Sequence, residues 1–400
     1  MTNSQARRRV GQDANGAPVC VEWSGETLAR VSPAPQDALT KNGALRILPG
    51  LCDIQINGYA GVNFNSPTVQ PEQLLRMARR VWASGAPLFC PTVITGSRER
   101  MRRSIQTIRA AARQDPLFGQ SAFGIHVEGP YISPEDGPRG AHPKQHVRPP
   151  DWDEFRQWQE DAEGEIRILT LSPEWDAPQF IERAVDAGVA AAIGHTNADA
   201  RQLNAAVEAG AKISTHLGNG AHATLPRHPN YIWEQLGDDR LWASFIADGH
   251  HLPPKTLCCM IRAKTLQRSV LVSDAVWLAD MPPGRYEGAD GQPLDKLANG
   301  RVQLADTPYL AGAALPLLRG VENAVRYAGL TLNEAAQLAS TNPMRFLNGG
   351  SSALEAGAPA NLTIIEWDAQ NAQARVLETV LNGETVYRNE TLTPNAKDIS

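Results

Sequence analysis

Acidic and imidazole side chains recur in this chain where short apolar runs come to an end. Glu128 follows GIHV, His195 follows AAAIG and His216 follows KIST, and a later apolar run, SVLV, leads to Asp274. A glutamate with two histidines, leaving one position open for water, is a common ligand set of catalytic zinc. The sequence therefore predicts a metal site formed by Glu128, His195 and His216, provided that the fold brings them together.

Each of these residues, taken alone, also has a purely structural interpretation. A lone buried histidine is more often a hydrogen-bonded core residue than a metal ligand, and a lone carboxylate can cap the following segment. The metal interpretation depends on convergence, because several polar groups at one buried rim each need a partner.

Two further residues could complete a hydrolytic site. A carboxylate beside an activated water can accept its proton and pass it to a leaving amine, which is the role predicted for Asp274. His142, in the loop sequence RGAHP, could hold the carbonyl oxygen of a substrate, or it could be an exposed loop histidine. Together these residues predict hydrolysis of an amide bond.

The elements that must position these residues alternate between apolar strands and amphipathic helices. Helical segments carry Pro early and Gly late in 71–85 and 177–188, and segment 199–210 also closes at a Gly. Eight strands, each followed by a crossover, predict a closed parallel barrel whose strands all end on one face. The least regular unit is 219–240, where prolines indicate a loop before any helix. The predicted strands lie near 51–56, 88–94, 122–128, 166–171, 189–195, 211–216, 242–248 and 269–274.

Both ends of the chain differ from this middle part. Residues 18–48 and 361–390 carry short β-like pieces broken by Gly, Pro and Asn, and Asn382-Gly383 is typical of a hairpin turn. We therefore predict a small β-sandwich domain built from both termini, residues 1–48 plus 356–400, around a barrel at 49–355.

Composition restricts the class of partner and compartment. The net charge of −5, with Lys and Arg spread along the chain, argues against nucleic acid or an anionic membrane surface as the main partner. No apolar run approaches the roughly 18 residues that span a bilayer, and the basic N-terminus lacks the apolar segment of a signal peptide. Five cysteines without a CxxC pattern predict reduced thiols in a cytoplasmic enzyme.

Six ordered motifs together resemble the N-acetylglucosamine-6-phosphate deacetylases of the amidohydrolase superfamily, over about residues 48–365. They are ILPGLCDIQINGYAGVNFN, GIHVEGPYISPEDGPRGAHP, IGHTNA, STHLGNG, IADGHHL and LVSDA. The resemblance implies an α/β fold, a (β/α)8 TIM barrel with a β-sandwich made from both termini. It implies one divalent metal, most simply zinc with iron or cobalt as alternatives, bound by Glu128, His195 and His216. It also implies Asp274 as the proton-transfer residue and His142 as a catalytic contact to the substrate.

The resemblance further implies a small amino-sugar substrate and the residues around it. Arg227 and His251 stand where the family grips the sugar phosphate. A homodimer is an expectation from the family. The remaining implied substrate contacts are Ala141, Asn219, Gly220, Leu310, Ala311 and Gly312.

Two departures from the family pattern keep alternatives open. Many superfamily members carry His-x-His where this chain has Asp53-Ile54-Gln55, so one metal is predicted and Gln55 is expected to point at the site without ligating it firmly. The loop THLGNGAHATLPRHPN also differs from the usual pattern. The alternatives are another amidohydrolase, a deacylase or cyclic amidase with a different substrate, phosphorylated or not, and a non-catalytic sugar-phosphate-binding relative.

Overall fold

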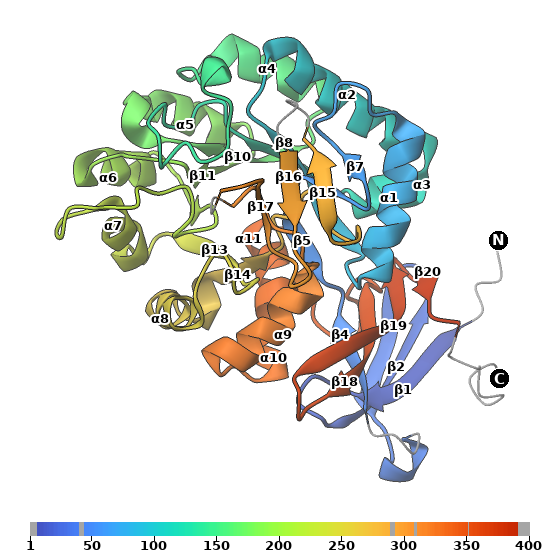
Figure 1. Cartoon of the computed structure of the whole chain (residues 1–400). Helices are drawn as coiled ribbons and strands as arrows, with labels where there is room; N and C mark the ends of the chain where they lie inside the picture. Colours follow the sequence, from blue (N-terminus) through green and yellow to red (C-terminus); the bar gives the residue numbers. More distant parts are fainter. Residues whose placement is uncertain (1–5, 40–43, 289–292, 308–309, 351, 391–400) are drawn as a thin grey trace.

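Eight parallel strands form the centre of the molecule, surrounded by helices (Figure 1). The structure is a computed structural model that describes residues 6–39, 44–288, 293–307, 310–350 and 352–390. The strands are neighbours in chain order, and the last meets the first through a parallel bridge between Ile56 and Ala275. This bridge closes the sheet into the predicted barrel. The strands are β5 (Cys52–Ile56), β8 (Leu88–Ile94), β9 (Ile125–Glu128), β10 (Ile166–Leu171), β11 (Ala190–Ile193), β12 (Ile213–Ser214), β13 (Trp242–Ile246) and β14 (Ser269–Val272).

Helices cover the barrel because each turns an apolar face to the strands. In α6, for example, Leu203, Ala206 and Val207 are buried, and Asp199 with Gln202 forms a capping box at its start. In the irregular unit 219–240, a loop precedes the short helix α7, as predicted. The α-helices are α1 (Pro71–Ala83), α2 (Arg98–Gln114), α3 (Pro116–Ser121), α4 (Trp152–Asp161), α5 (Pro178–Asp186), α6 (Ala200–Glu208), α7 (Tyr231–Gly237), α8 (Pro254–Lys264), α9 (Leu317–Ala328), α10 (Leu332–Ala339) and α11 (Thr341–Phe346). Short 3₁₀ turns lie at Gln36–Ala38, Lys144–His146, Pro173–Trp175 and Leu266–Arg268.

Strands from the two ends of the chain lie side by side in a separate sheet, drawn in blue and red in Figure 1. Its order is β20-β19-β18-β4-β1-β2-β3, and it has its own apolar core, with Trp23, Ile47 and Val380 fully or almost fully buried. Asn382 and Gly383 have φ of 43° and 80°, so the predicted hairpin turn between β19 and β20 is confirmed. The strands are β1 (Arg7–Gln12), β2 (Pro18–Ser24), β3 (Thr27–Pro33), β4 (Leu45–Pro49), β18 (Leu362–Asp368), β19 (Gln373–Leu381) and β20 (Glu384–Arg388).

The barrel and the separate sheet confirm the predicted fold class. The exact boundaries of the two domains stay a prediction, and residues 1–5, 40–43 and 391–400 of the terminal domain lie outside the described residues. Among the described residues, no helix is long and apolar enough to cross a membrane.

Two small sheets were not predicted. A hairpin pairs β6 (Gly58–Tyr59) with β7 (Val62–Asn63), and three strands follow β14, namely β15 (Gly284–Glu287), β16 (Pro293–Lys296) and β17 (Val302–Leu304). Lys296 joins the second sheet to the loop after β14 by donating hydrogen bonds to the carbonyls of Leu278 and Met281, at 2.9 and 2.6 Å. Strands of only two to four residues carry too little periodicity to be predicted from sequence.

Candidate active site

The predicted site residues lie at or just past the C-terminal ends of the barrel strands. Glu128 is the last residue of β9, whereas His195, His216 and Asp274 each lie two residues past the end of β11, β12 and β14. All three of the latter have a left-handed backbone, with φ of 49°, 30° and 48°. This conformation costs a residue with a Cβ atom about 1 kcal/mol or more, and such strain gathers at functional sites.

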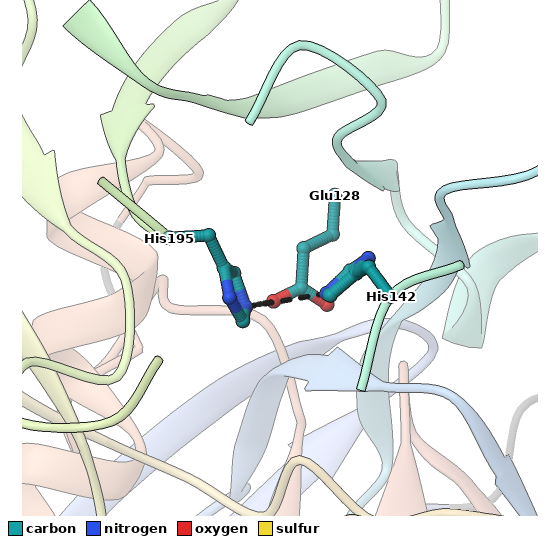
Figure 2. Close-up of side chains that lie close together, drawn as sticks. All are labelled: Glu128, His142 and His195. Carbon is teal, nitrogen blue, oxygen red and sulfur yellow. Dashed lines mark hydrogen bonds and ion pairs between the residues drawn. The ribbon is translucent and has the colours of Figure 1, made fainter. Parts of the chain in front are cut away.

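Their side chains converge on one buried point. The Glu128 Oε1 atom lies 2.9 Å from His216 Nε2 and 3.2 Å from His195 Nε2, and the two Nε2 atoms are 3.1 Å apart. His142 Nε2 approaches His195 Nε2 at 3.2 Å from a loop beyond β9. Figure 2 shows Glu128, His142 and His195 pointing toward one another. The sequence prediction that these residues lie together is thus met by the geometry.

The donor atoms of this cluster suit a cation. His195 Nδ1 lies 2.8 Å from the carbonyl oxygen of Pro138, which can only accept, so Nδ1 carries the ring proton of the neutral imidazole. Nε2 of His195 then presents a lone pair to the Glu128 carboxylate, an arrangement that a positive ion between them would stabilise. Ligand atoms of Glu128, His142 and His195 lie within 4.8 Å of one another. The residues present therefore fit a divalent metal.

The electrostatics of the cluster point the same way. Burial alone would raise the pKa of Glu128, but its close contacts with the rings of His195 and His216 lower it well below its usual range. Burial works against the charged form of His216, yet the hydrogen bond and charge of Glu128 raise its pKa. The carboxylate is held ionised, as a metal ligand must be.

Gln55 lies in direct contact with the cluster. Its Nε2 donates to Glu128 Oε1 at 3.0 Å, and its side chain is buried. Gln55 therefore presents an N–H group to Glu128 from the end of β5.

Asp274 is held at the rim between β14 and β5. Asn57 Nδ2 donates to its Oδ1 at 2.6 Å, and its own N–H donates to the Gln55 carbonyl at 2.9 Å. Burial, with the added charge of Glu128, raises the pKa of Asp274 to about 6. A carboxyl group with such a pKa can both take up and release a proton near neutral pH.

His142 is fixed from behind by Thr95. Its Nδ1 lies 2.8 Å from Thr95 Oγ1, and both residues are buried. Because burial and the neighbouring His195 lower the pKa of His142 to about 3, the ring is neutral and carries one proton. If Thr95 donates to Nδ1, that proton sits on Nε2 and faces the lone pair of His195 Nε2, which explains their 3.2 Å contact.

Two of the remaining predicted residues contact the cluster, and two others are exposed. The Asn219 N–H and side chain donate to the His216 carbonyl at 3.0 and 3.2 Å. Gly220 lies against the His195 ring so closely that a Cβ atom there would be 2.5 Å from Nδ1. Ala141 and Arg227 are exposed, and none of the hydrogen bonds or ion pairs found among the described residues includes Arg227.

The other two predicted contacts lie beside Asp274. His251 is bonded to Asp248 at the end of β13, and its charge acts on the Asp274 carboxyl. The turn of Leu310, Ala311 and Gly312 leads directly to Ala313, whose N–H faces the Asp274 carbonyl at 3.4 Å.

Three groups that support the site were not singled out from the sequence. Thr95, which directly follows β8, could have been found by the rule applied to the other strand ends. Asn57 was noticed only as part of a motif. The Pro138 carbonyl carries no sequence signal, because any residue supplies one.

Comparisons with known proteins find relatives over most of the chain. The profile of the Amidohydrolase family matches residues 46–386. A human relative, N-acetylglucosamine-6-phosphate deacetylase, is 32% identical, covering 86% of this chain and 84% of its own. An N-acetylgalactosamine-6-phosphate deacetylase of Shewanella is 31% identical, covering 86% and 84%. Among solved structures, a mutant N-acetyl-D-glucosamine-6-phosphate deacetylase of Mycobacterium smegmatis, in complex with N-acetyl-D-glucosamine-6-phosphate, superposes with a TM-score of 0.83. It is 27% identical and covers 95% of this chain and 99% of its own.

Proposed function

Since the chain belongs to the amidohydrolase family, we propose that it hydrolyses the N-acetyl amide of N-acetylglucosamine 6-phosphate to glucosamine 6-phosphate and acetate. The observation that carries the proposal is the convergence of Glu128, His195 and His216 beside His142 and Asp274 on one end of the barrel. The names of the relatives support the substrate class.

Glu128, His195 and His216 are the proposed ligands of one divalent metal. His142 also lies close to these three residues, but it comes from a loop and its hydrogen-bond contact within the cluster is to His195. Glu128, in contrast, contacts both His195 and His216. When bound, the metal would polarise the amide carbonyl and lower the pKa of water, so that water can lose a proton and attack near neutral pH. Zinc suits this ligand set, and so do iron and cobalt. Gln55 stays beside Glu128 without ligating, which supports a single metal.

The proton transfers are assigned to two residues. Asp274 accepts a proton as water attacks the carbonyl carbon, and it delivers that proton to the nitrogen as the C–N bond breaks. His142, with its proton on Nε2, donates to the carbonyl oxygen where negative charge develops. The remaining proton of the water also ends on the amine, so the products are acetate and the protonated amine, and atoms and charge balance.

The rest of the sugar is assigned by position. Arg227 and His251 are proposed to bind the phosphate, because a guanidinium and an imidazolium both pair with such an anion. Ala141, Asn219, Gly220, Leu310, Ala311 and Gly312 would line the sugar. A homodimer and a cytoplasmic compartment remain predictions.

A second candidate substrate is N-acetylgalactosamine 6-phosphate, favoured by the Shewanella relative of that name at 31% identity. The two sugars differ only in the configuration of one hydroxyl, so the same metal, base and donor would serve both.

Steady-state acetate release with purified, zinc-loaded protein tests the proposal. The panel holds both 6-phosphorylated N-acetyl sugars and unphosphorylated N-acetylglucosamine. We expect turnover of a phosphorylated sugar with kcat/KM at least about 100-fold above that of the unphosphorylated one, as for loss of a charge-assisted contact worth roughly 3 kcal/mol. Turnover of none of the three, with metal bound, would refute the substrate class and redirect attention to the loop at 218–228.

A further inference from the structure

Asp248 is a buried carboxylate that the proposed reaction does not use. Like His195, His216 and Asp274, it lies two residues past the end of its strand, here β13. The side chains of Asp248 and His251 are only 6% and 8% exposed, and Asp248 Oδ2 lies 2.7 Å from His251 Nδ1. A carboxylate and an imidazole thus form a closed pair at the active-site end of the barrel.

The turn that holds this pair is fixed on several sides. Asp248 Oδ1 accepts hydrogen bonds from the N–H groups of His250 and His251, both at 2.8 Å. The Ala247 carbonyl accepts from Asn323 on α9 at 2.8 Å. His250 Nε2 lies 3.1 Å from the Asn299 carbonyl, between β16 and β17. His250 is therefore occupied with the outer sheet, while the neighbouring His251 belongs to the inner pair.

The carboxylate determines which nitrogen of His251 is free. Burial would raise the pKa of Asp248, but the hydrogen bond and charge of His251 and the two backbone N–H groups lower it. An ionised carboxylate 2.7 Å from Nδ1 requires a proton on Nδ1. Within the described residues no partner is found for His251 Nε2, and the charge of this ring reaches the Asp274 carboxyl. Nε2 is thus the atom available to a ligand.

We propose that Asp248 is a positioning residue of the substrate site, holding His251 with Nε2 toward the substrate and balancing the positive charge that this ring carries against the phosphate. The inference rests on the proposed function, because His251 is the assigned phosphate contact. Chemically it resembles the carboxylate–histidine pairs that orient metal-binding and catalytic imidazoles.

Asp248→Asn separates this role from simple capping of the turn. The amide oxygen can still accept from the two backbone N–H groups, but the amide nitrogen cannot accept the proton of His251 Nδ1. The ring loses its counter-charge and is driven to the other neutral tautomer. We expect KM for the phosphorylated sugar to rise about 10- to 100-fold, the usual effect of such outer contacts, with kcat changed less than about 3-fold.

Asp368 offers a matched control. Its Oδ1 accepts from the N–H groups of Gln370 and Asn371, two and three residues on, at 2.9 and 3.2 Å, in an exposed turn without a histidine. Asp368→Asn should therefore leave both kinetic constants unchanged. Unphosphorylated N-acetylglucosamine, assayed with Asp248→Asn, should show no change in kcat/KM.

Nitrogen NMR of His251 gives a readout that capping alone would not move. In the zinc-loaded wild type, inorganic phosphate should bring both ring nitrogens of His251 to the protonated state. In Asp248→Asn, Nδ1 should lose its proton and the phosphate-induced change should weaken at least 10-fold in affinity. Equal KM increases for phosphorylated and unphosphorylated sugar, or an unchanged Nδ1, would overturn the inference. If the wild type turned over neither sugar, the proposed function would fail, and the phosphate titration would still decide the role of Asp248.

Discussion

Replacement of Thr95 by Val tests how the site prepares His142 for its proposed role. Valine has the shape of threonine but lacks the hydroxyl group, so it removes the side-chain hydrogen bond found for His142 Nδ1 among the described residues, at 2.8 Å. Thr95 is fully buried, so water cannot readily take the place of the hydroxyl. The substitution therefore perturbs the tautomer of His142 with little change in packing.

The size of the effect follows from that one hydrogen bond. Leaving a buried nitrogen without a partner costs about 1–3 kcal/mol of stability. If the hydroxyl donates to Nδ1 rather than to the Glu128 carbonyl 3.5 Å away, it favours the tautomer with a proton on Nε2 by roughly 1–2 kcal/mol, and its loss should then lower kcat about 5- to 30-fold. Complete loss of a donor to the developing oxyanion would cost about 100- to 1000-fold, which sets the upper limit.

Single-turnover and steady-state acetate release, with metal content measured in parallel, give the answer. Thr95→Ser keeps the hydroxyl group and should retain kcat within about 3-fold, while Thr95→Val should lose activity with one metal still bound and KM nearly unchanged. A Val variant with normal kcat would show that His142 does not act as a donor through Nε2. A variant that had lost its metal would show that His142 is a ligand instead.

Three other substitutions test different parts of the argument. In Asp274→Asn the geometry of the rim is kept but the base is lost, so metal should stay bound while kcat falls at least about 1000-fold; near-normal kcat would refute the assigned role. Gly129 and Gly188 have nearly the same φ, 79° and 80°. A Cβ atom at Gly129 would lie 2.2 Å from the Thr95 hydroxyl oxygen, whereas a Cβ atom at Gly188 would have no atom within 4 Å. Backbone strain should cost about 1 kcal/mol of stability for alanine at either position, as measured by thermal unfolding. The close contact should make Gly129→Ala the more destabilising of the two, and only this variant should also lower kcat. Burial would raise the pKa of Glu378, but hydrogen bonds and charge from Arg9 and a second arginine lower it in the folded protein. The ionised Glu378 therefore stabilises the fold fully above about pH 5, and this stabilisation is lost as the pH falls through the folded-state pKa. Glu378→Gln should lower stability at pH 7 by roughly 1–3 kcal/mol and flatten the acid limb of the pH–stability curve; an unchanged acid limb would exclude this pair as its cause.

The barrel could be predicted because its strands combine buried apolar residues with regular helix punctuation. All eight predicted strands are present, although β9 begins at Ile125 and β12 holds only Ile213 and Ser214. The missed β1 strand, Arg7–Gln12, begins with three arginines, and Arg9 pairs with the buried Glu378 of β19. Such a strand is stabilised by partners more than 360 residues away in sequence, which local patterns cannot predict.

The site could be predicted as a set of residues but not as a geometry. Glu128, His195 and His216 were predicted because each follows an apolar run. A histidine near one of these runs can also mislead. His126 is also a buried histidine of β9, yet its ring nitrogens lie 3.1 Å from the Ile54 carbonyl and 2.7 Å from Thr170 Oγ1. It is a hydrogen-bonded core histidine, and only its position two residues before Glu128, inside the strand, separates it from the ligands.

The position of the site residues along their strands explains why strand ends are so informative in this fold. His195, His216, Asp248 and Asp274 all stand two residues beyond the last residue of their strands. In a parallel barrel the strand ends share one rim, so an equal offset along neighbouring strands brings the side chains to similar depth. The left-handed backbone at three of these positions costs stability, and the surrounding hydrogen bonds must hold it. The sequence shows that these residues follow apolar runs, but the predicted strands end at the residues themselves, so neither the offset of two residues nor the φ angle was predicted. The position of a residue after an apolar run therefore predicts which residues meet. The strained backbone, and the 3.2 Å contact between His195 Nε2 and Glu128, are seen only in the structure.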